Sequence, residues 1–125
     1  MAKTIHDDVL DGALNIVKNN GTRLSVCNAQ PTTYTEAITT FKLAIRTIAP
    51  ADFTGPVDGD VSGRKLTVNQ QATITVDADG TATHVAVSDS VNSKLLLVTT
   101  CTSQVLTAGN TVTIPAFKEE IADPA

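Results

Sequence analysis

The side chains best suited to chemistry are two histidines and two cysteines, and the sequence marks no catalytic or metal-ligand set around them. His6 falls at the start of a predicted helix, where a solvated residue near the cap is a better interpretation than a ligand. His84 falls in a strand-like stretch and is a candidate catalytic base, but neither a nucleophile nor an orienting carboxylate marks its surroundings. Cys27 and Cys101 lie in apolar, strand-like contexts, which favours buried free thiols over a disulfide or a metal site.

Aspartates are the other candidate ligands. Asp77 and Asp79, followed by Gly80, begin like a calcium loop, and Asp58 and Asp60 lie in a second acidic stretch. A calcium loop uses further oxygen ligands and a distal glutamate that this stretch lacks, and a hairpin turn also selects aspartate before glycine. The glycines are spread singly and no G-x-S-x-G motif occurs, so neither a phosphate loop nor a nucleophile elbow is predicted. The residues therefore predict no enzyme, no cofactor and no metal site.

Length and charge narrow the class of protein. A chain of 125 residues can form one domain with a sizeable core, and we expect a single domain over residues 1–125. The net charge of −4 argues against direct binding of nucleic acid, which needs a cationic surface. No apolar run approaches the roughly 20 residues of a membrane helix, and the first residues lack the pattern of a secretory signal. We therefore expect a chain that folds in a cytosol and has no membrane partner.

Threonine- and valine-rich segments with alternating apolar residues dominate the second half of the chain. Leu66, Val68, Ala72 and Ile74 alternate with polar residues, which is the period of a strand with one buried face. The predicted strands span residues 24–27, 41–48, 64–68, 72–76, 83–88, 94–101 and 111–117. Short strands at this spacing predict a mainly β fold, in the form of an antiparallel β-sandwich or barrel of the jelly-roll type.

One N-terminal amphipathic helix is predicted over about residues 5–20. Thr4 and Asp7 resemble a capping arrangement, and Gly21 is a stop signal. The apolar residues at helical spacing are Ile5, Val9, Leu10, Ala13, Leu14 and Val17. A single helix of this kind must lie on a sheet or on another subunit, and we expect the sheet.

Three segments fall outside the strand pattern. Residues 28–40 are polar and predict a loop, with one helical turn near residues 35–37. Residues 49–63 contain proline and several glycines among aspartates, which predicts a long exposed loop. Residues 116–125 predict an extended C-terminal tail.

Several stretches resemble small structural proteins of tailed bacteriophages. They are Ile5 to Asp11, Leu24 to Ala37, Thr83 to Val87, and Leu106 to Pro115. The most distinctive part is the pattern C-x-x-x-P-x-T-Y-x-E-A, which begins at Cys27. Such proteins are often encoded beside the major capsid protein, and many of them decorate the capsid as cement proteins. The family has no catalytic residues to carry over.

The resemblance implies a virion protein that is assembled in the host bacterial cytoplasm. A decoration protein would bridge capsomers and stabilise the head, with the major capsid protein and other copies of itself as partners. Capsid symmetry favours a trimer. The alternative is a component of the neck, tail or fibre, including a receptor-binding module, although the scarcity of aromatic residues argues against sugar stacking. Copy number per virion distinguishes the two.

A protein that binds a shell needs contact segments that are too apolar or too long for a free surface. We expect these contacts at Phe53, Pro56 and Val57 in the predicted loop, and at Phe117 and Ile121 in the predicted tail. The alternative is that Phe53 and Phe117 fold back onto their own core.

Overall fold

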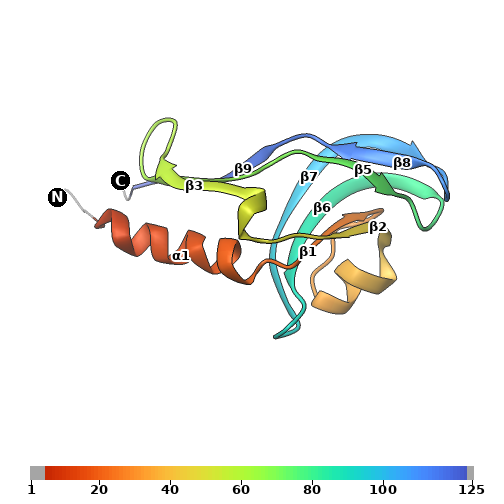
Figure 1. Cartoon of the computed structure of the whole chain (residues 1–125), viewed down its shortest axis with the longest axis horizontal. Helices are drawn as coiled ribbons and strands as arrows, with labels where there is room; N and C mark the ends of the chain where they lie inside the picture. Colours follow the sequence, from red (N-terminus) through yellow and green to blue (C-terminus); the bar gives the residue numbers. More distant parts are fainter. Residues whose placement is uncertain (1–4, 124–125) are drawn as a thin grey trace.

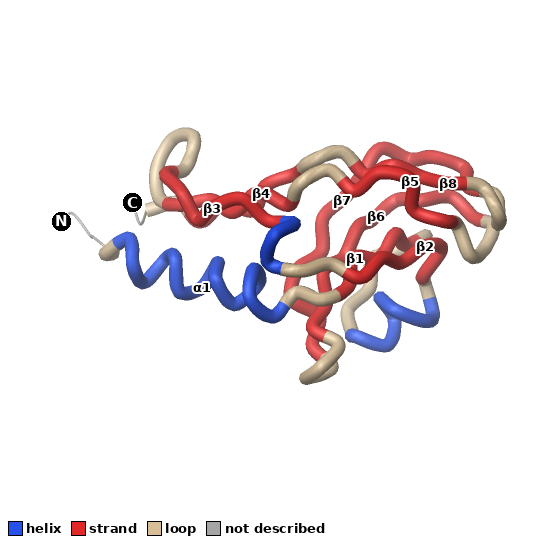
Figure 2. The backbone as a smooth tube through the Cα atoms, viewed as in Figure 1, coloured by secondary structure: helices blue, strands red, loops and turns tan. Residues whose placement is uncertain are grey.

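The computed structural model describes residues 5–123 and has two β layers and one N-terminal helix (Figures 1 and 2). All strand pairs within these layers are antiparallel. The predicted mainly β, sandwich-like fold with a helix at the N-terminus is therefore confirmed.

The first layer is a four-stranded sheet with the order β2-β1-β6-β7. Its strands are β1 (Arg23–Cys27), β2 (Lys42–Thr47), β6 (Gly80–Asp89) and β7 (Lys94–Leu106). The central strand β1 is buried on both faces. Leu24 and Val26 belong to the core shared with the second layer, whereas the Cys27 thiol lies 3.6 Å from the carbonyl oxygen of Ala37. Ala37 belongs to the π-helix η1 (Glu36–Thr40), so a helical turn does interrupt the predicted loop over residues 28–40.

The second layer is built on a long two-stranded ribbon with one break. It consists of β4 (Arg64–Val68) and β5 (Gln71–Thr75) on one side, and of β8 (Thr111–Ile114) and β9 (Phe117–Ile121) on the other. Val68 lies opposite Phe117 and Gln71 opposite Ile114, so one register continues across the break. In this register Pro115 falls in the gap, and the ladder stops there because proline has no N–H to donate.

The predicted exposed loop over residues 49–63 is wrong for most of its length. A short 3-10 helix, η2 (Pro50–Asp52), and a strand, β3 (Phe53–Asp58), occupy it, and β3 pairs with β4. A register shift between Thr54 and Val57 disturbs the strand at Gly55 and Pro56. Such a shift removes the alternation by which a strand is recognised in sequence. An irregular loop remains at residues 59–63.

The predicted tail is also part of a sheet. Strand β9 accounts for five of its residues and pairs along its whole length with β4, which gives a three-stranded sheet of order β3-β4-β9. Its backbone is extended, as predicted, but it is hydrogen-bonded within its own chain. Residues 124 and 125 of the predicted tail lie outside the described residues.

Helix α1 (Asp7–Asn20) lies against the β3-β4-β9 end of the second layer (Figure 1). Nδ1 of His6 accepts a hydrogen bond from the backbone N–H of Asp8 at 3.1 Å, so His6 is the N-cap. The capping residue predicted at Thr4 lies outside the described residues. Leu10 and Leu14 are buried, which confirms that the helix packs on the sheet. No helix within residues 5–123 is long and apolar enough to cross a membrane.

An aliphatic core joins the two layers. Most of its members are valine, leucine and isoleucine from strands that face one another across the sandwich. The large side chains of this core that are almost completely buried are Leu14, Leu24, Val26, Leu43, Leu66, Val68, Ile74, Val76, Val85 and Val87.

Candidate protein-binding site

The two long sides of the sandwich are constructed differently. On one side β2 reaches across to the second layer. An isolated bridge joins Ala44 to Val76, and the carbonyl oxygen of Leu43 accepts hydrogen bonds from the N–H groups of Asp77 and Ala78, at 2.7 and 3.2 Å. We call this the closed side. It resembles the corner of a barrel, where the backbone groups of both edges are satisfied.

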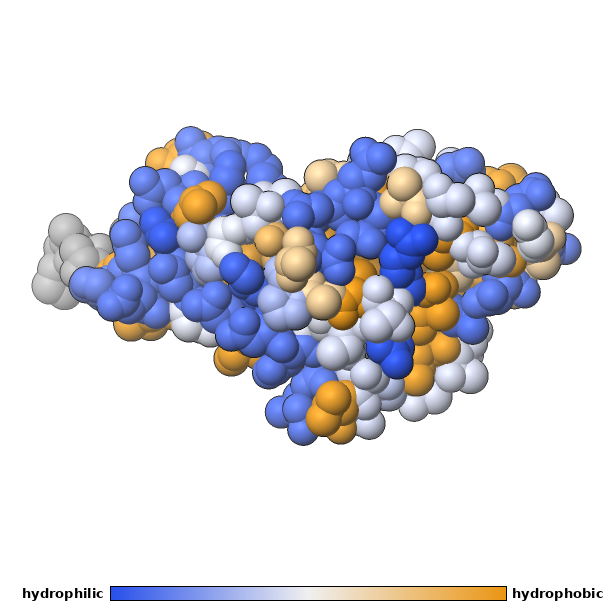
Figure 3. All heavy atoms as spheres, viewed as in Figure 1, coloured by the Kyte–Doolittle hydropathy of each residue, from blue (hydrophilic) through white to orange (hydrophobic). Residues whose placement is uncertain are grey.

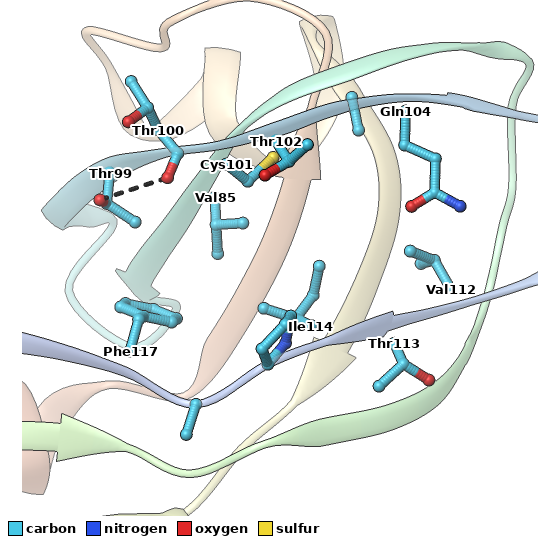
Figure 4. A pocket seen from close by; sticks show the side chains of 13 residues that line it. Val85, Thr99, Thr100, Cys101, Thr102, Gln104, Val112, Thr113, Ile114 and Phe117 are labelled. Carbon is cyan, nitrogen blue, oxygen red and sulfur yellow. Dashed lines mark hydrogen bonds between the residues drawn. The ribbon is translucent and has the colours of Figure 1, made fainter.

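The opposite side, which we call the open side, lies between β7 and the segment from β8 to β9. β7 pairs with β6 alone, and among residues 5–123 no strand pairs with its outer edge. A groove of about 350 Å³ separates the two layers here. Val85, Ile114 and Phe117 form its apolar base, and residues 99–102 of β7 form one wall (Figure 4).

Strand β7 has an unusual sequence for an edge. From Leu95 to Leu106 it contains neither a charged residue nor a proline. Proteins ordinarily use lysine, proline or short length to prevent an edge strand from pairing with another chain. Register shifts place extra residues in β7 near Leu96 and between Thr100 and Gln104. Shifts of this kind re-aim side chains, and the second one lies in the wall of the groove.

The groove offers neutral chemistry. None of its lining residues carries a charge at neutral pH, and Cys101 is the one with an ionisable side chain. Burial raises the pKa of the Cys101 thiol above its usual value. The remaining polar groups are threonine hydroxyls and the amide of Gln104. This lining can accept an apolar side chain and offer hydrogen bonds to a peptide backbone.

The structure keeps the other candidate chemical residues apart from this groove. His84 is partly buried in β6, and its Nδ1 lies 2.8 Å from the hydroxyl of the neighbouring Thr83. His6 is the exposed cap of α1. Cys27 is buried and is a free thiol, like Cys101. Burial, followed by the charge of Cys101, raises the pKa of Cys27 to about 11. Both cysteines are free thiols, as expected, but the expected burial is confirmed for Cys27 only, because Cys101 is partly exposed at the groove.

The four aspartates considered as calcium ligands each have a partner within the chain. The partners are Arg64 for Asp58, Lys65 and Lys118 for Asp60, Lys42 for Asp77, and the backbone N–H of Ala108 for Asp79. Within residues 5–123 no group of three or more histidine, cysteine, aspartate or glutamate side chains is arranged to hold a metal ion. The aspartates therefore serve turns and ion pairs.

The structure places the five predicted contact residues in different environments. Phe53 is only 5% exposed and belongs to the core, so its side chain is not available to a partner. Its place opposite Val68 in the β3-β4 pair explains the burial. Val57 is 43% exposed, Pro56 is half-buried, and Ile121 packs partly against the core.

Phe117 is the one predicted contact residue that the structure places in the groove. Sequence reasoning missed the rest of the site, in particular the outer edge of β7. The signal was present as the long uncharged stretch from Leu95 to Leu106. Strand order decides whether such a stretch lies at an edge or in the centre of a sheet.

Comparisons of the chain with protein-family models, with curated proteins and with solved structures gave no match.

Proposed function

We propose that this protein is a structural component of a tailed-bacteriophage virion, and that it decorates the capsid by binding the major capsid protein through the open side of its sandwich. The observation that supports a binding role is the uncharged outer edge of β7 beside an apolar groove. The resemblance to phage structural proteins supports a place in the virion, and on the capsid in particular. Several copies would act together as a homo-oligomer on the shell.

The expected mode of binding is the addition of a strand. An extended segment of the capsid protein would hydrogen-bond with the free N–H and C=O groups of β7. One of its apolar side chains would enter the groove against Val85, Ile114 and Phe117. Because the groove is neutral, a segment with few charges fits best. Binding would cover backbone groups that otherwise remain open to water or to aggregation.

Heads assembled without the protein provide the first test. If it acts as cement, such heads lose their DNA at a lower temperature or under milder ionic stress than complete heads. Addition of the purified protein restores the stability. Equal stability of both kinds of head would contradict the cement role.

Copy number per virion tests the location. A coat on an icosahedral head requires on the order of hundreds of copies, whereas a neck or tail component is present in roughly three to twelve. Quantitative mass spectrometry of purified virions measures this number. A count in the lower range would replace the decoration role by the neck, tail or fibre alternative.

A matched pair of variants tests the surface. Thr100 is exposed on β7 and lines the groove, whereas Thr47 is exposed on β2 at the closed side. We expect Thr100→Lys to reduce binding to heads at least about tenfold, because a charge on an edge strand disfavours pairing. Thr47→Lys adds the same charge and should leave binding unchanged. Normal binding by the Thr100→Lys variant would contradict the proposed surface.

A further inference from the structure

Helix α1 is apolar on the side that faces away from its own chain. Val9 is 64% exposed and Ile16 is 55% exposed, and Gly12 and Ala13 between them are exposed as well. Gly12 and Ala13 lie three and four residues from both Val9 and Ile16, so the four residues form a single stripe on the side away from Leu10 and Leu14. We call it the outer stripe. The solvent face of a helix ordinarily carries charged residues instead.

Two charged residues of α1, Asp11 and Lys18, contact the body of the protein. Both carboxylate oxygens of Asp11 accept hydrogen bonds from Arg64 on β4, at 2.7 and 3.2 Å. Nζ of Lys18 donates to the carbonyl oxygen of Gly55 at 2.9 Å. The helix is thus held to the sheet by polar contacts, in addition to its buried leucines. Asp11 and Lys18 are thus used on the inside, Asp7 and Asp8 are exposed in the first turn, and the outer stripe itself carries no charge.

Gly12 lies in the middle of the outer stripe. Glycine is a poor helix former, and its presence inside a helix needs a reason. A Cβ atom placed at Gly12 would meet nothing within 4 Å, so no contact within the described chain requires glycine there. A small residue in a helix allows the backbone of another helix to approach closely. The position therefore points to a helical partner.

The views of the whole chain agree with this interpretation. α1 projects beside the sandwich, with the second layer on one side and no other element below it (Figure 1). Apolar atoms appear along the lower surface of the helix (Figure 3). The outer stripe is therefore free of contacts with the elements that the structure describes.

We propose that the outer stripe of α1 binds α1 of a second copy of this chain, with the two helices antiparallel about a two-fold axis near Gly12 and Ala13. In this arrangement Val9 packs against Ile16 of the second copy, and Gly12 meets Ala13. The spacing of three and four residues is that of a helix-packing seam, so the stripe is complementary to itself. This inference does not depend on the proposed virion role.

Charge favours this partner and this orientation. Each chain has a net charge of −4, but the stripe is uncharged, so two copies meet there without opposed like charges. A parallel arrangement would bring Asp7 and Asp8 of both copies together and align the helix dipoles. A membrane surface is disfavoured as the partner, because the stripe lacks the flanking basic residues that such helices use.

The size of the contact sets the expected strength. Two helices of 14 residues bury less surface than a standard-size interface of roughly 1,200 to 2,000 Å². We therefore expect a dimer that dissociates on dilution, with a dissociation constant above about 1 µM. Binding side by side on a larger particle would strengthen such a weak contact.

Sedimentation velocity of the purified chain, from about 5 µM to about 1 mM, tests the proposal. We expect the mass to rise with concentration toward twice 13.0 kDa. Ile16→Asp should raise the dissociation constant at least about tenfold, because it places a charge in the stripe. Val91→Asp is the matched control, since Val91 is 81% exposed and lies in the turn between β6 and β7. A monomer at every concentration, a mass of three chains, or equal behaviour of the two variants would overturn the proposal.

The Gly12→Leu variant tests whether glycine at this position is needed for dimerisation or for folding of the single chain. Leucine favours the helix and meets nothing within the chain, so the variant should melt at a higher temperature than the wild type at low concentration. It should also dimerise more weakly, because the helices can no longer approach at that position. Dimerisation as strong as that of the wild type would overturn the close contact at Gly12.

Discussion

The closed and open sides of the sandwich both lie between an edge strand of the first layer and the second layer, but only the closed side is bridged by backbone hydrogen bonds. At the closed side, Leu43 is 2% exposed and its carbonyl oxygen is bonded to the segment after β5. At the open side, β7 is the longest strand of the described chain and its outer edge has no partner there. The difference lies in one connection: the segment that follows β5 turns back onto β2, whereas the segment that joins β8 to β9 does not reach β7.

This comparison shows which sheet edge has no partner strand within the described residues. Backbone N–H and C=O groups must be paired in the folded protein or solvated by water. At the closed side, the carbonyl oxygen of Leu43 and the bridge between Ala44 and Val76 use part of the edge internally, so less of it is open to a partner. At the open side, the outer edge of β7 has no partner strand within residues 5–123 and borders a groove with an apolar base, which is the combination that a binding strand can use.

The largest expected effect is on stability at the closed side. Leu43→Ala should lower the free energy of unfolding by about 2–5 kcal/mol, because it leaves a cavity in the core. Val105→Ala on β7 should change it by less than about 0.5 kcal/mol, since Val105 is 77% exposed. Urea denaturation of both variants measures the difference. Equal losses would contradict the assignment of the closed side to the core.

The two cysteines give the second contrast. A pKa of about 11 for Cys27, two units above the usual 9.0, leaves roughly a hundredfold less thiolate than a free cysteine has at neutral pH. The pKa of Cys101 is also raised, but Cys101 borders the groove. A thiol reagent should therefore label Cys101 first. Mass spectrometry of timed samples measures this order. Labelling of both should become faster as pH rises, because the reactive thiolate forms only as pH approaches each raised pKa. Faster labelling of Cys27 would contradict the described burial.

The smallest effect concerns the ion pair at the closed side. Nζ of Lys42 lies 3.2 Å from a carboxylate oxygen of Asp77. Asp77→Asn should lower the free energy of unfolding by less than about 1 kcal/mol, because partly exposed ion pairs are weak. The loss should disappear at high salt. A larger loss of stability that persists at high salt would mean that this ion pair, and not the backbone hydrogen bonds and packing, holds the closed side together.

Sequence predicted the regular elements of this fold well. β4 has the predicted bounds, and β1, β2 and β5 differ from prediction by only one residue at their ends. β1 and β4 alternate between apolar and polar residues, and β2 and β5 do so in part, so the local pattern is sufficient. The prediction for β7 stopped at Cys101, whereas the strand continues to Leu106.

The missed features depend on contacts between distant segments. β3 was read as loop because Gly55 and Pro56 disturb its alternation, and it becomes a strand only by pairing with β4. Phe53 was expected at a surface, yet the same pairing buries it. The open edge of β7 could not be predicted, because it follows from the strand order of the whole sheet. Phe117 was found because an aromatic residue in a polar segment is visible in the sequence.

Hydrogen exchange of the protein, free and bound to heads, tests the central claim most directly. In the free protein, the amides of β7 that face away from β6 should exchange faster than those of β2, because the closed side is bonded and the open side is not. On binding, exchange in β7 should slow at least about tenfold, and exchange in β2 should stay unchanged. Protection of β2 or of another surface, with β7 unaffected, would contradict the account.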